Sequence, residues 1–313
     1  MKRVLAPKML ELYRHLLADG TDGVIELPAT MRGRRFRCEA AEEVGPVADQ
    51  RNHEGHDQRH GGTEVTTGTT EWAVRCELAA LYRLMAHLKM TDLIDTHITA
   101  RVPGEQDHFL INRYGVLFNE MKASDLVKID AQGCVVERDP DPVRHRVNVA
   151  GFVIHSAVHS AREDMHWVIH VHTAASSAVS AQEDGLLPIS QHALRFYERL
   201  AYHDYEGIAI DTEERERLIR DLGKHQAMIL RNHGILVGAP SAAEAFSLVY
   251  FLEQACRIQV GAMSGNARLR MPSPAVREKT ARQFESPGER EVIELGWQAA
   301  LRLIGDQAAE YRS

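Results

Sequence analysis

The chain has 313 residues, of which 44% are hydrophobic and 26% are charged, and its formal net charge is −7. The composition is that of an ordinary globular protein, and the length suffices for one large domain with an extension or for two modest domains. The acidic balance and the lack of a basic stripe argue against nucleic-acid binding. The sequence contains no run of about 18 apolar residues, so it predicts no membrane-spanning helix. The four cysteines lie far apart with no CxxC pair, so they predict neither a thiolate metal site nor a disulfide framework. Taken together, these features lead us to expect a soluble cytoplasmic protein.

Residues 1–70 differ from the rest of the chain, and we expect an N-terminal extension that is largely flexible. Residues 49–70 are rich in Gly, His and Thr and contain almost no apolar side chains, so they bury too little surface to offset the entropy of ordering. His53, His56 and His60 lie in this tract at helical spacing. A solvated polar segment explains them better than a metal site does.

Regular elements are predicted from Thr70 onward. Thr69 or Thr70 can cap a first helix, because the apolar residues from Val74 to Leu88 follow the i, i+4, i+7 spacing of one helix face. Short β-rich runs follow at 97–102, 109–111, 127–129 and 134–136, and later strands are expected around 168–173, 207–210 and 228–238. Further helices are expected at 149–163, 174–182, 213–222, 242–263, 274–284 and 289–309. Helices that flank a many-stranded β region indicate a layered α/β or α+β domain rather than a helical bundle.

The most informative stretch is the strand Val168-Ile169-His170-Val171-His172-Thr173. Side chains on a β-strand alternate with a period of two, so His170 and His172 emerge on one face, about 7 Å apart along the chain. Two imidazoles in this arrangement can converge on one metal ion, with Zn–N bonds of about 2.0–2.1 Å. On its own the pair is a weak signal, because two histidines on a half-buried strand need no ligand.

A third histidine lies in the apolar run from Met228 to Gly238, which is typical of two strands joined at Asn232-His233-Gly234. Gly234 permits the positive φ that a tight bend needs, and such a bend would aim His233 away from the strand ladder. This third imidazole strengthens the case for a metal site.

Three segments resemble the class II aldolase/adducin family, and in particular its adducin-like branch. They are Phe109-Leu110-Ile111-Asn112 through Lys128-Ile129-Asp130, then Val168–Thr173, then Leu230–Gly234. The resemblance covers about residues 71–265. It implies a three-layer α/β/α sandwich with a mixed, largely antiparallel sheet, often assembled as a homotetramer. The chain would then consist of the extension 1–70, the metal-binding domain 71–265, and C-terminal helices at 266–313 that pack on the domain or on a neighbouring subunit.

The resemblance also implies a divalent metal held by His170, His172 and His233. Zn²⁺ is the expected ion, with Fe²⁺ or Mn²⁺ as alternatives, because imidazole suits each of them. Three neutral imidazoles with one open position are typical of a catalytic rather than a structural site. In the aldolases the metal polarises a carbonyl or enediolate oxygen while a C–C bond breaks.

The chain departs from the sugar-phosphate members of the family at two places. Their catalytic glutamate, with the two phosphate-binding serines before it, would fall on Val149, Ala150 and Gly151. A Gly-Asn pair near their first strand is replaced here by Thr96-His97. A phosphorylated substrate is therefore disfavoured.

Two other histidines are candidates for the missing acid/base group. His155 lies one helical turn after Gly151 and would project from the same face, as a general base or a fourth ligand. His192 falls near the position of a catalytic tyrosine in the aldolases. Arg195 could pair with a substrate carboxylate through its planar guanidinium. His159 and His166 are expected at the surface.

Three functions remain open. The first is a metal-dependent lyase, an aldolase or decarboxylase that acts on a small non-phosphorylated hydroxy- or keto-acid or a related carbonyl compound. The second is a three-histidine iron oxygenase. The third is an adducin-like interaction module without catalysis.

Overall fold

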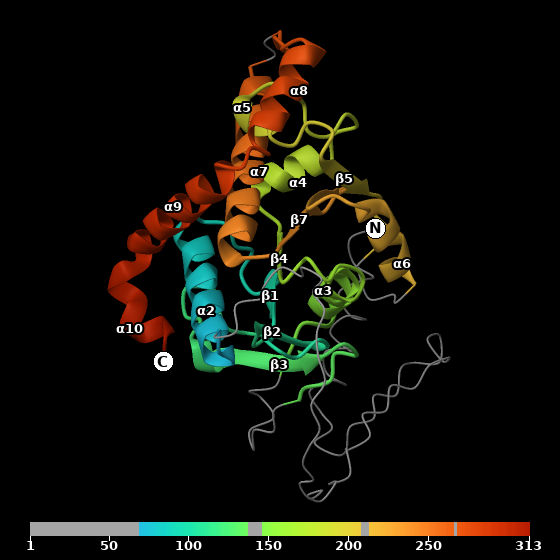
Figure 1. Ribbon diagram of the computed structural model, residues 1–313. Coiled ribbons are helices and arrows are strands. Elements are labelled where there is room, and N and C mark those ends of the chain that lie inside the picture. Colours follow the sequence, from blue (N-terminus) through green and yellow to red (C-terminus); the bar gives the residue numbers. More distant parts are fainter. Residues whose placement is uncertain (1–68, 137–145, 208–212, 266–267) are drawn as a thin grey trace, which may run out of the picture. The chain divides into compact units, whose positions relative to one another are not determined.

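The computed structural model describes residues 69–136, 146–207, 213–265 and 268–313 (Figure 1). Nearly all of the expected flexible extension, including His53, His56 and His60, lies outside the described residues. Most of the strand expected at 207–210 also lies outside them.

The elements follow the predicted order. The helices are α2 (Glu71–His87), α3 (Val149–Ala161), α4 (Ala174–Ser180), α5 (Gln191–Leu194), α6 (Glu214–Leu222), α7 (Ala242–Met263), α8 (Pro274–Gln283), α9 (Glu289–Leu301) and α10 (Ala308–Tyr311), with 3-10 helices η2 (Ala123–Asp125) and η4 (Arg302–Gln307). The strands are β1 (His97–Arg101), β2 (His108–Asn112), β3 (Leu126–Asp130), β4 (Trp167–Val171), β5 (Leu200–His203), β6 (Ala227–Leu230) and β7 (Gly234–Ala239). The short elements α5 and β5 were not predicted.

The described strands form one sheet in the order β3-β2-β1-β4-β7-β6-β5. Every neighbouring pair is antiparallel except β5 and β6, which run parallel. The predicted mixed, largely antiparallel sheet is therefore confirmed. The run at 134–136 is not a strand, because only Val135 makes an isolated bridge, to Ile129.

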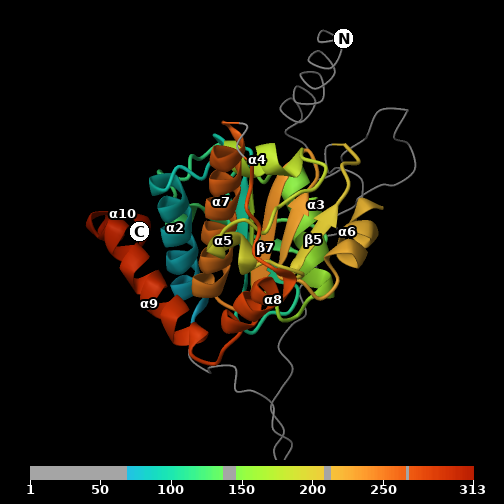
Figure 2. The ribbon, with the colours of Figure 1, turned by 90° about the horizontal axis from the view of Figure 1, so that it is seen from above.

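Helices cover both faces of this sheet, as Figure 2 shows, with α3 and α6 on one side and α2 and α7 on the other. The residues of β4 alternate between the two layers. Ile169 and Val171 belong to the core cluster that includes α2 and α7, whereas Val168 belongs to the cluster beneath α3 and α6. The three-layer α/β/α architecture is confirmed, and the alternation places His170 on the face of α3 and α6.

Hydroxyl side chains cap four of the described helices, and in α5 the cap is Ser190. The Thr70 hydroxyl accepts a hydrogen bond from the Ala73 amide at 3.2 Å, which confirms the predicted start of α2. Ser241 caps α7 in the same way, and Thr173 caps α4. Each such cap contributes about 1 kcal/mol to the stability of the helix that follows.

The C-terminal helices lie against helices of the sandwich. Helix α9 packs along α7, where the rings of Trp297 and Phe246 are 5.6 Å apart between centroids. Helix α10 packs on α2, and Glu310 forms an ion pair with Arg83 at 3.1 Å. Residues 268–313 thus continue the helical layer on the α2 and α7 face.

Two expectations came from composition. Cys76 and Cys256 are free thiols, but Cys134 is disulfide-bonded, so the expectation that the cysteines form no disulfide is wrong at that position. In the part of the chain that the structure describes, every helix is too short or too polar to cross a bilayer.

Candidate metal centre

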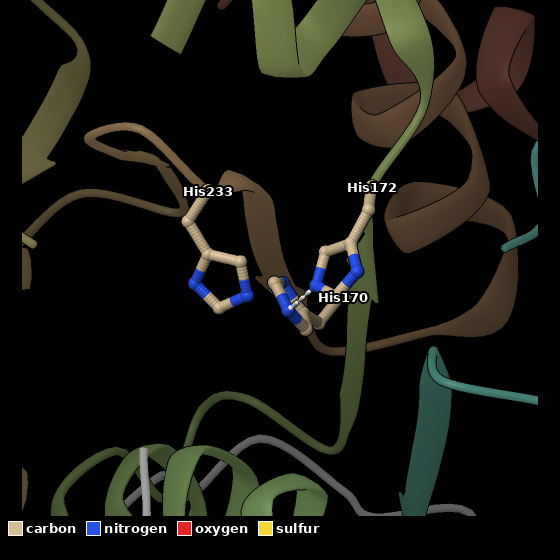
Figure 3. Close-up of side chains that lie close together, drawn as sticks. All are labelled: His170, His172 and His233. Carbon is tan, nitrogen blue, oxygen red and sulfur yellow. Dashed lines mark hydrogen bonds between the residues drawn. The ribbon is translucent and has the colours of Figure 1, made fainter. Parts of the chain in front are cut away.

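Three histidines converge where β4 ends and β7 begins (Figure 3). His170 lies in β4, His172 follows the end of that strand, and His233 lies in the turn between β6 and β7. One ring nitrogen from each lies within 4.8 Å of the others, and the ring centroids are 4.5–4.7 Å apart. The antiparallel pairing of β4 with β7 sets Val171 opposite Ile235 and so brings the distant sequence segments together.

Helix α4 fixes the turn that carries His233. The Ser177 hydroxyl donates a hydrogen bond to the carbonyl of His233 at 2.9 Å, and the Ser180 hydroxyl accepts one from its amide at 3.1 Å. Because α4 starts directly after His172 and Thr173, one short helix positions two of the three histidines. Sequence reasoning did not single out these serines, although their i, i+3 spacing after the HxH strand was visible.

Gly234 is needed for a different reason from the one predicted. The residue with positive φ in this turn is Asn232, at 55°, so the expectation of a positive φ at Gly234 is wrong. A Cβ at Gly234 would lie 2.3 Å from the carbonyl oxygen of Val171 and 3.1 Å from a ring carbon of His172. Only glycine lets the two histidine-bearing segments approach this closely.

Gly234→Ala is therefore expected to destabilise the protein by about 3 kcal/mol, the upper end of the range for overpacking, because a backbone carbonyl cannot move aside as a side chain can. Urea unfolding of the metal-free protein measures this. Gly296→Ala is the matched control, since a Cβ there meets nothing within 4 Å. Equal stability of the two variants would contradict the expectation.

The hydrogen-bond partners of His170 and His172 fix their tautomers. Nδ1 of His170 donates to the carbonyl of Ile235 at 2.9 Å, and Nδ1 of His172 donates to the carboxylate of Asp92 at 3.3 Å. Because both partners only accept, each neutral ring presents an unprotonated Nε2. These two Nε2 atoms lie 2.7 Å apart, the contact marked in Figure 3. Two lone pairs repel at that distance unless a cation lies between them, so this donor set fits a divalent metal.

The three histidines are held in their neutral form. Burial lowers the pKa of His170 well below its usual value, with His233 the next cause. Burial, followed by the neighbouring His172, lowers the pKa of His233 to about 4. Burial also lowers the pKa of His172, although Asp92 opposes that shift. All three rings are thus neutral at pH 7, which is the form that binds a metal.

A fourth imidazole, His97, lies beside this group. Strand β1 pairs with β4 so that His97 is directly opposite His170, and their ring centroids are 5.1 Å apart. A Cβ at Gly151 would lie 2.5 Å from Cδ2 of His97. The two departures from the sugar-phosphate enzymes therefore depend on each other, because the ring of His97 fills the space that a side chain at Gly151 would need.

His155 contacts His97 rather than the three-histidine group. Its Nε2 lies 2.8 Å from Nδ1 of His97, and its Nδ1 lies 2.6 Å from the Thr99 hydroxyl. His155 is thus separated from the group by one imidazole. The expectation that His159 lies at the surface is wrong, since it is buried and its Nε2 lies 2.7 Å from the same hydroxyl.

The burial of His159 predicts acid sensitivity. Burial, followed by the charge of Arg101, lowers the pKa of His159 to about 3. Below about pH 6.5 the unfolded chain binds a proton at this residue that the folded chain does not, so its contribution to stability is lost as the pH falls from about 6.5 toward 3. The loss is about 1 kcal/mol per pH unit within that window. Urea unfolding at several pH values should give a shallower slope for His159→Gln than for the wild type, and equal slopes would contradict this.

His192 and Arg195 lie on and just after α5. The ring of His192 is 5.6 Å from that of Phe251, and His192 is not part of the three-histidine group. Its catalytic role stays a prediction. The guanidinium of Arg195 pairs with Glu289, bonds the Ser247 hydroxyl at 3.0 Å and lies over the Phe251 ring, so it is committed to the protein's own side chains.

A small, partly open hollow lies beside the turn of His233. It is lined by Ile154, His203, Asp204, Tyr205, Gly207, Glu214, Leu218, Leu230, Arg231 and His233. The segment from Tyr202 to Tyr205, whose polar-tipped aromatic residues are typical of a pocket wall, contributes three of these residues. The surroundings of His233 are therefore mixed in polarity and carry both signs of charge.

Comparisons with known proteins agree with this architecture. The chain matches the model of the class II aldolase and adducin N-terminal domain over residues 76–260. It is 49% identical to an aldolase II superfamily protein from Pseudomonas syringae, with a TM-score of 0.74 and coverage of 79% of this chain and 98% of that one. L-fuculose 1-phosphate aldolase from Glaciozyma antarctica shares the fold at 24% identity and a TM-score of 0.70, covering 81% and 97% of the two chains. Alpha-adducin from Rattus norvegicus is 44% identical over 218 residues, which are 69% of this chain and 28% of adducin. The chain belongs to the class II aldolase and adducin family.

Proposed function

We propose that the protein is a divalent-metal-dependent lyase of the cytoplasm that cleaves a C–C bond in a small non-phosphorylated hydroxy- or keto-acid. The observation that carries this proposal is the pair of opposed Nε2 lone pairs of His170 and His172, 2.7 Å apart, with His233 beside them. Such a set of three neutral imidazoles would hold one ion and leave a position for substrate.

The protein's own groups would prepare this site. The carbonyl of Ile235 and the carboxylate of Asp92 orient His170 and His172 and keep their Nε2 atoms free for coordination. Serines of α4 hold the backbone of His233 in place. When bound, a divalent ion supplies Lewis-acid stabilisation of the negative charge that develops on a substrate oxygen.

The substrate class follows from what surrounds His97. Gly151 offers no side chain, and the ring of His97 occupies the adjoining space, so the glutamate of the sugar-phosphate aldolases is absent here. The two positions before it are Val149 and Ala150, which have no hydroxyl to bind a phosphate. A small acid without a phosphate group therefore fits better than a sugar phosphate.

Metal removal tests this proposal. We expect about one zinc ion per chain in the purified protein, and chelation is expected to abolish the cleavage of hydroxy- and keto-acids in a substrate screen, with recovery when Zn²⁺ is returned. Elemental analysis and a coupled carbonyl or CO₂ assay measure both quantities. Protein that neither contains nor takes up a divalent metal would refute the proposal, and oxygen uptake by iron-loaded protein would redirect it to an oxygenase.

We also propose that the protein acts as a homo-oligomer, with a tetramer as the expected form. Three large apolar side chains stand exposed on α9 and η4, with exposed fractions of 59% at Val292, 64% at Leu295 and 50% at Leu303. Apolar side chains gathered on one segment are typical of an interface. Light scattering of the purified protein measures the assembly, and Leu295→Glu is expected to shift it toward monomer.

A second candidate is an adducin-like interaction module, which the 44% identity to alpha-adducin favours. The two candidates differ in what they need from the histidines. If His170→Ala removes all catalysis and leaves assembly intact, the lyase is supported. If no activity exists in the wild type and the variant changes assembly, the interaction module is supported.

A further inference from the structure

A buried chain of side chains runs from the three-histidine group into the layer beneath α3. It consists of His97, His155, Thr99 and His159, each no more than 2% exposed. The successive contacts are 2.8 Å from Nδ1 of His97 to Nε2 of His155, 2.6 Å from Nδ1 of His155 to the Thr99 hydroxyl, and 2.7 Å from that hydroxyl to Nε2 of His159. The chain ends where Nδ1 of His159 meets the carbonyl oxygen of Met165 at 3.0 Å.

The carbonyl end fixes the direction of every hydrogen bond. A carbonyl oxygen only accepts, so His159 carries its proton on Nδ1 and its neutral Nε2 accepts. The single Thr99 proton must then point to His159, and the Thr99 oxygen accepts from Nδ1 of His155. The neutral Nε2 of His155 accepts in turn from Nδ1 of His97. His97 is therefore left with an unprotonated Nε2.

Both ends of the chain keep it in this one arrangement. Burial is the main cause that lowers the pKa of His155 and His159, so these two rings are neutral. The ring of His97, only 2% exposed, is equally withdrawn from water, which disfavours a charged form. A proton passed along the chain could not leave at Met165, because its carbonyl cannot take one. The chain is thus a lock on the tautomer of His97 and not a path for protons.

The unprotonated Nε2 belongs to a ring that lies beside the three-histidine group, 5.1 Å from the ring of His170 between centroids. Nε2 of His97 has no hydrogen-bond partner among the described residues. It keeps some accessible surface, because it is absent from the set of fully enclosed side-chain atoms without a partner. Its ring is the cross-strand neighbour of His170. The Cδ2–Nε2 edge faces Gly151, where a Cβ would lie 2.5 Å from Cδ2 and 3.0 Å from Nε2, so only glycine leaves room for this edge.

We propose that this chain of hydrogen bonds fixes His97 as a hydrogen-bond acceptor at the metal site. Nε2 of His97 then receives a hydroxyl hydrogen of the bound substrate. The assignment rests on the proposed lyase function and narrows it to hydroxy-acids, because an acceptor locked in this way has no proton to donate to a keto oxygen. His97 is then a catalytic residue, and His155, Thr99 and His159 are positioning residues.

The first test reads the tautomer directly and needs neither metal nor substrate. Ring-¹⁵N-histidine protein is examined metal-free near pH 7, with His97 assigned from His97→Phe among the 17 histidines of the chain. We expect a protonated Nδ1 and an unprotonated Nε2 at His97. Thr99→Val should give a mixture of both tautomers, whereas Thr99→Ser keeps the hydroxyl and should preserve the wild-type spectrum. A wild-type His97 with its proton on Nε2 would overturn the proposal even if a variant fails to fold.

The second test uses glycolate and methoxyacetate as probes of the zinc-loaded protein, because they differ in the hydroxyl hydrogen. The ratio of their dissociation constants, measured by calorimetry, is expected to favour glycolate and to fall about fivefold in Thr99→Val and in His97→Phe, the worth of one neutral hydrogen bond. Thr99→Ser should retain the wild-type ratio. An unchanged ratio in all variants would overturn the acceptor role.

The two proposals fail separately. If the protein takes up no zinc, the lyase function is refuted, and the substrate role of His97 is refuted with it. The spectrum of the metal-free protein still decides whether the hydrogen-bond chain fixes the tautomer of His97. If zinc binds and catalysis is found but His97 shows the opposite tautomer, the lyase stands and this inference is overturned.

Discussion

His170→Ala is expected to lower zinc affinity by more than the roughly 10- to 100-fold that loss of a hydrogen-bond partner behind a ligand produces, and to reduce cleavage to background. The change removes the most buried of the three imidazoles and leaves only two ligands. It also leaves the Ile235 carbonyl without its donor, which costs about 1–3 kcal/mol of stability. Zinc content after dialysis against a competing chelator, together with urea unfolding, measures both effects.

A graded series makes this expectation specific. Asp92→Asn removes charge behind His172 while keeping an acceptor, and because the Asp92 side chain is 51% exposed the loss of zinc affinity should lie near the lower end of that range. His166→Ala, at a half-buried position outside the three-histidine group, is the matched control and should keep full zinc content. If His170→Ala retained zinc as His166→Ala does, the group would not be the metal site.

Local sequence signals predicted the parts of the fold that depend on local chemistry. The Thr70 cap, the bounds of α7 and the strand pair around His233 all follow from periodicity and from turn-forming residues within a few positions. The parallel pairing of β5 with β6 was not predicted, because the four residues of β5 carry no distinctive alternation and their partner is distant in sequence.

The sequence predicted only part of the candidate site, because the rest depends on contacts between distant segments. His170, His172 and His233 stand in recognisable motifs, whereas His97 enters through the register of β1 against β4, which sets it opposite His170. No pattern within β1 indicates that register. The burial of His159 was missed because it falls near the end of a helix, where a polar residue is usually solvated, and its partners Thr99 and Met165 come from other segments.

The coupling between His97 and Gly151 leads to the second large expectation. Gly151→Ala should destabilise the protein by about 1–3 kcal/mol, the usual cost of overpacking. Glycine within a helix normally gains about 0.5–1 kcal/mol when replaced by alanine, so helix propensity alone predicts the opposite sign. The difference arises because a Cβ at Gly151 would lie 2.5 Å from His97, whose ring is held by its bond to His155 and cannot turn away.

A double-mutant cycle isolates this contact. His97→Ala alone leaves the His155 nitrogen without its donor and opens a cavity, so it should also destabilise the protein by about 1–3 kcal/mol. In the double variant the new methyl group meets no ring. The double variant should therefore lose less stability than the sum of the two single variants, by about 1–3 kcal/mol. Gly261→Ala in α7, where a Cβ meets nothing within 4 Å, is the control and should be neutral or stabilising.

The same cycle with glutamate at position 151 asks why this chain lacks the carboxylate of the sugar-phosphate aldolases. Gly151→Glu alone should fold poorly, because the longer side chain must pass the ring of His97. Combined with His97→Gly, the glutamate gains the space of the imidazole and should be tolerated, with zinc content retained because neither position belongs to the three-histidine group. If Gly151→Glu were as stable as wild type with His97 in place, the two residues would be independent, and the missing carboxylate would need another explanation than the room that His97 takes.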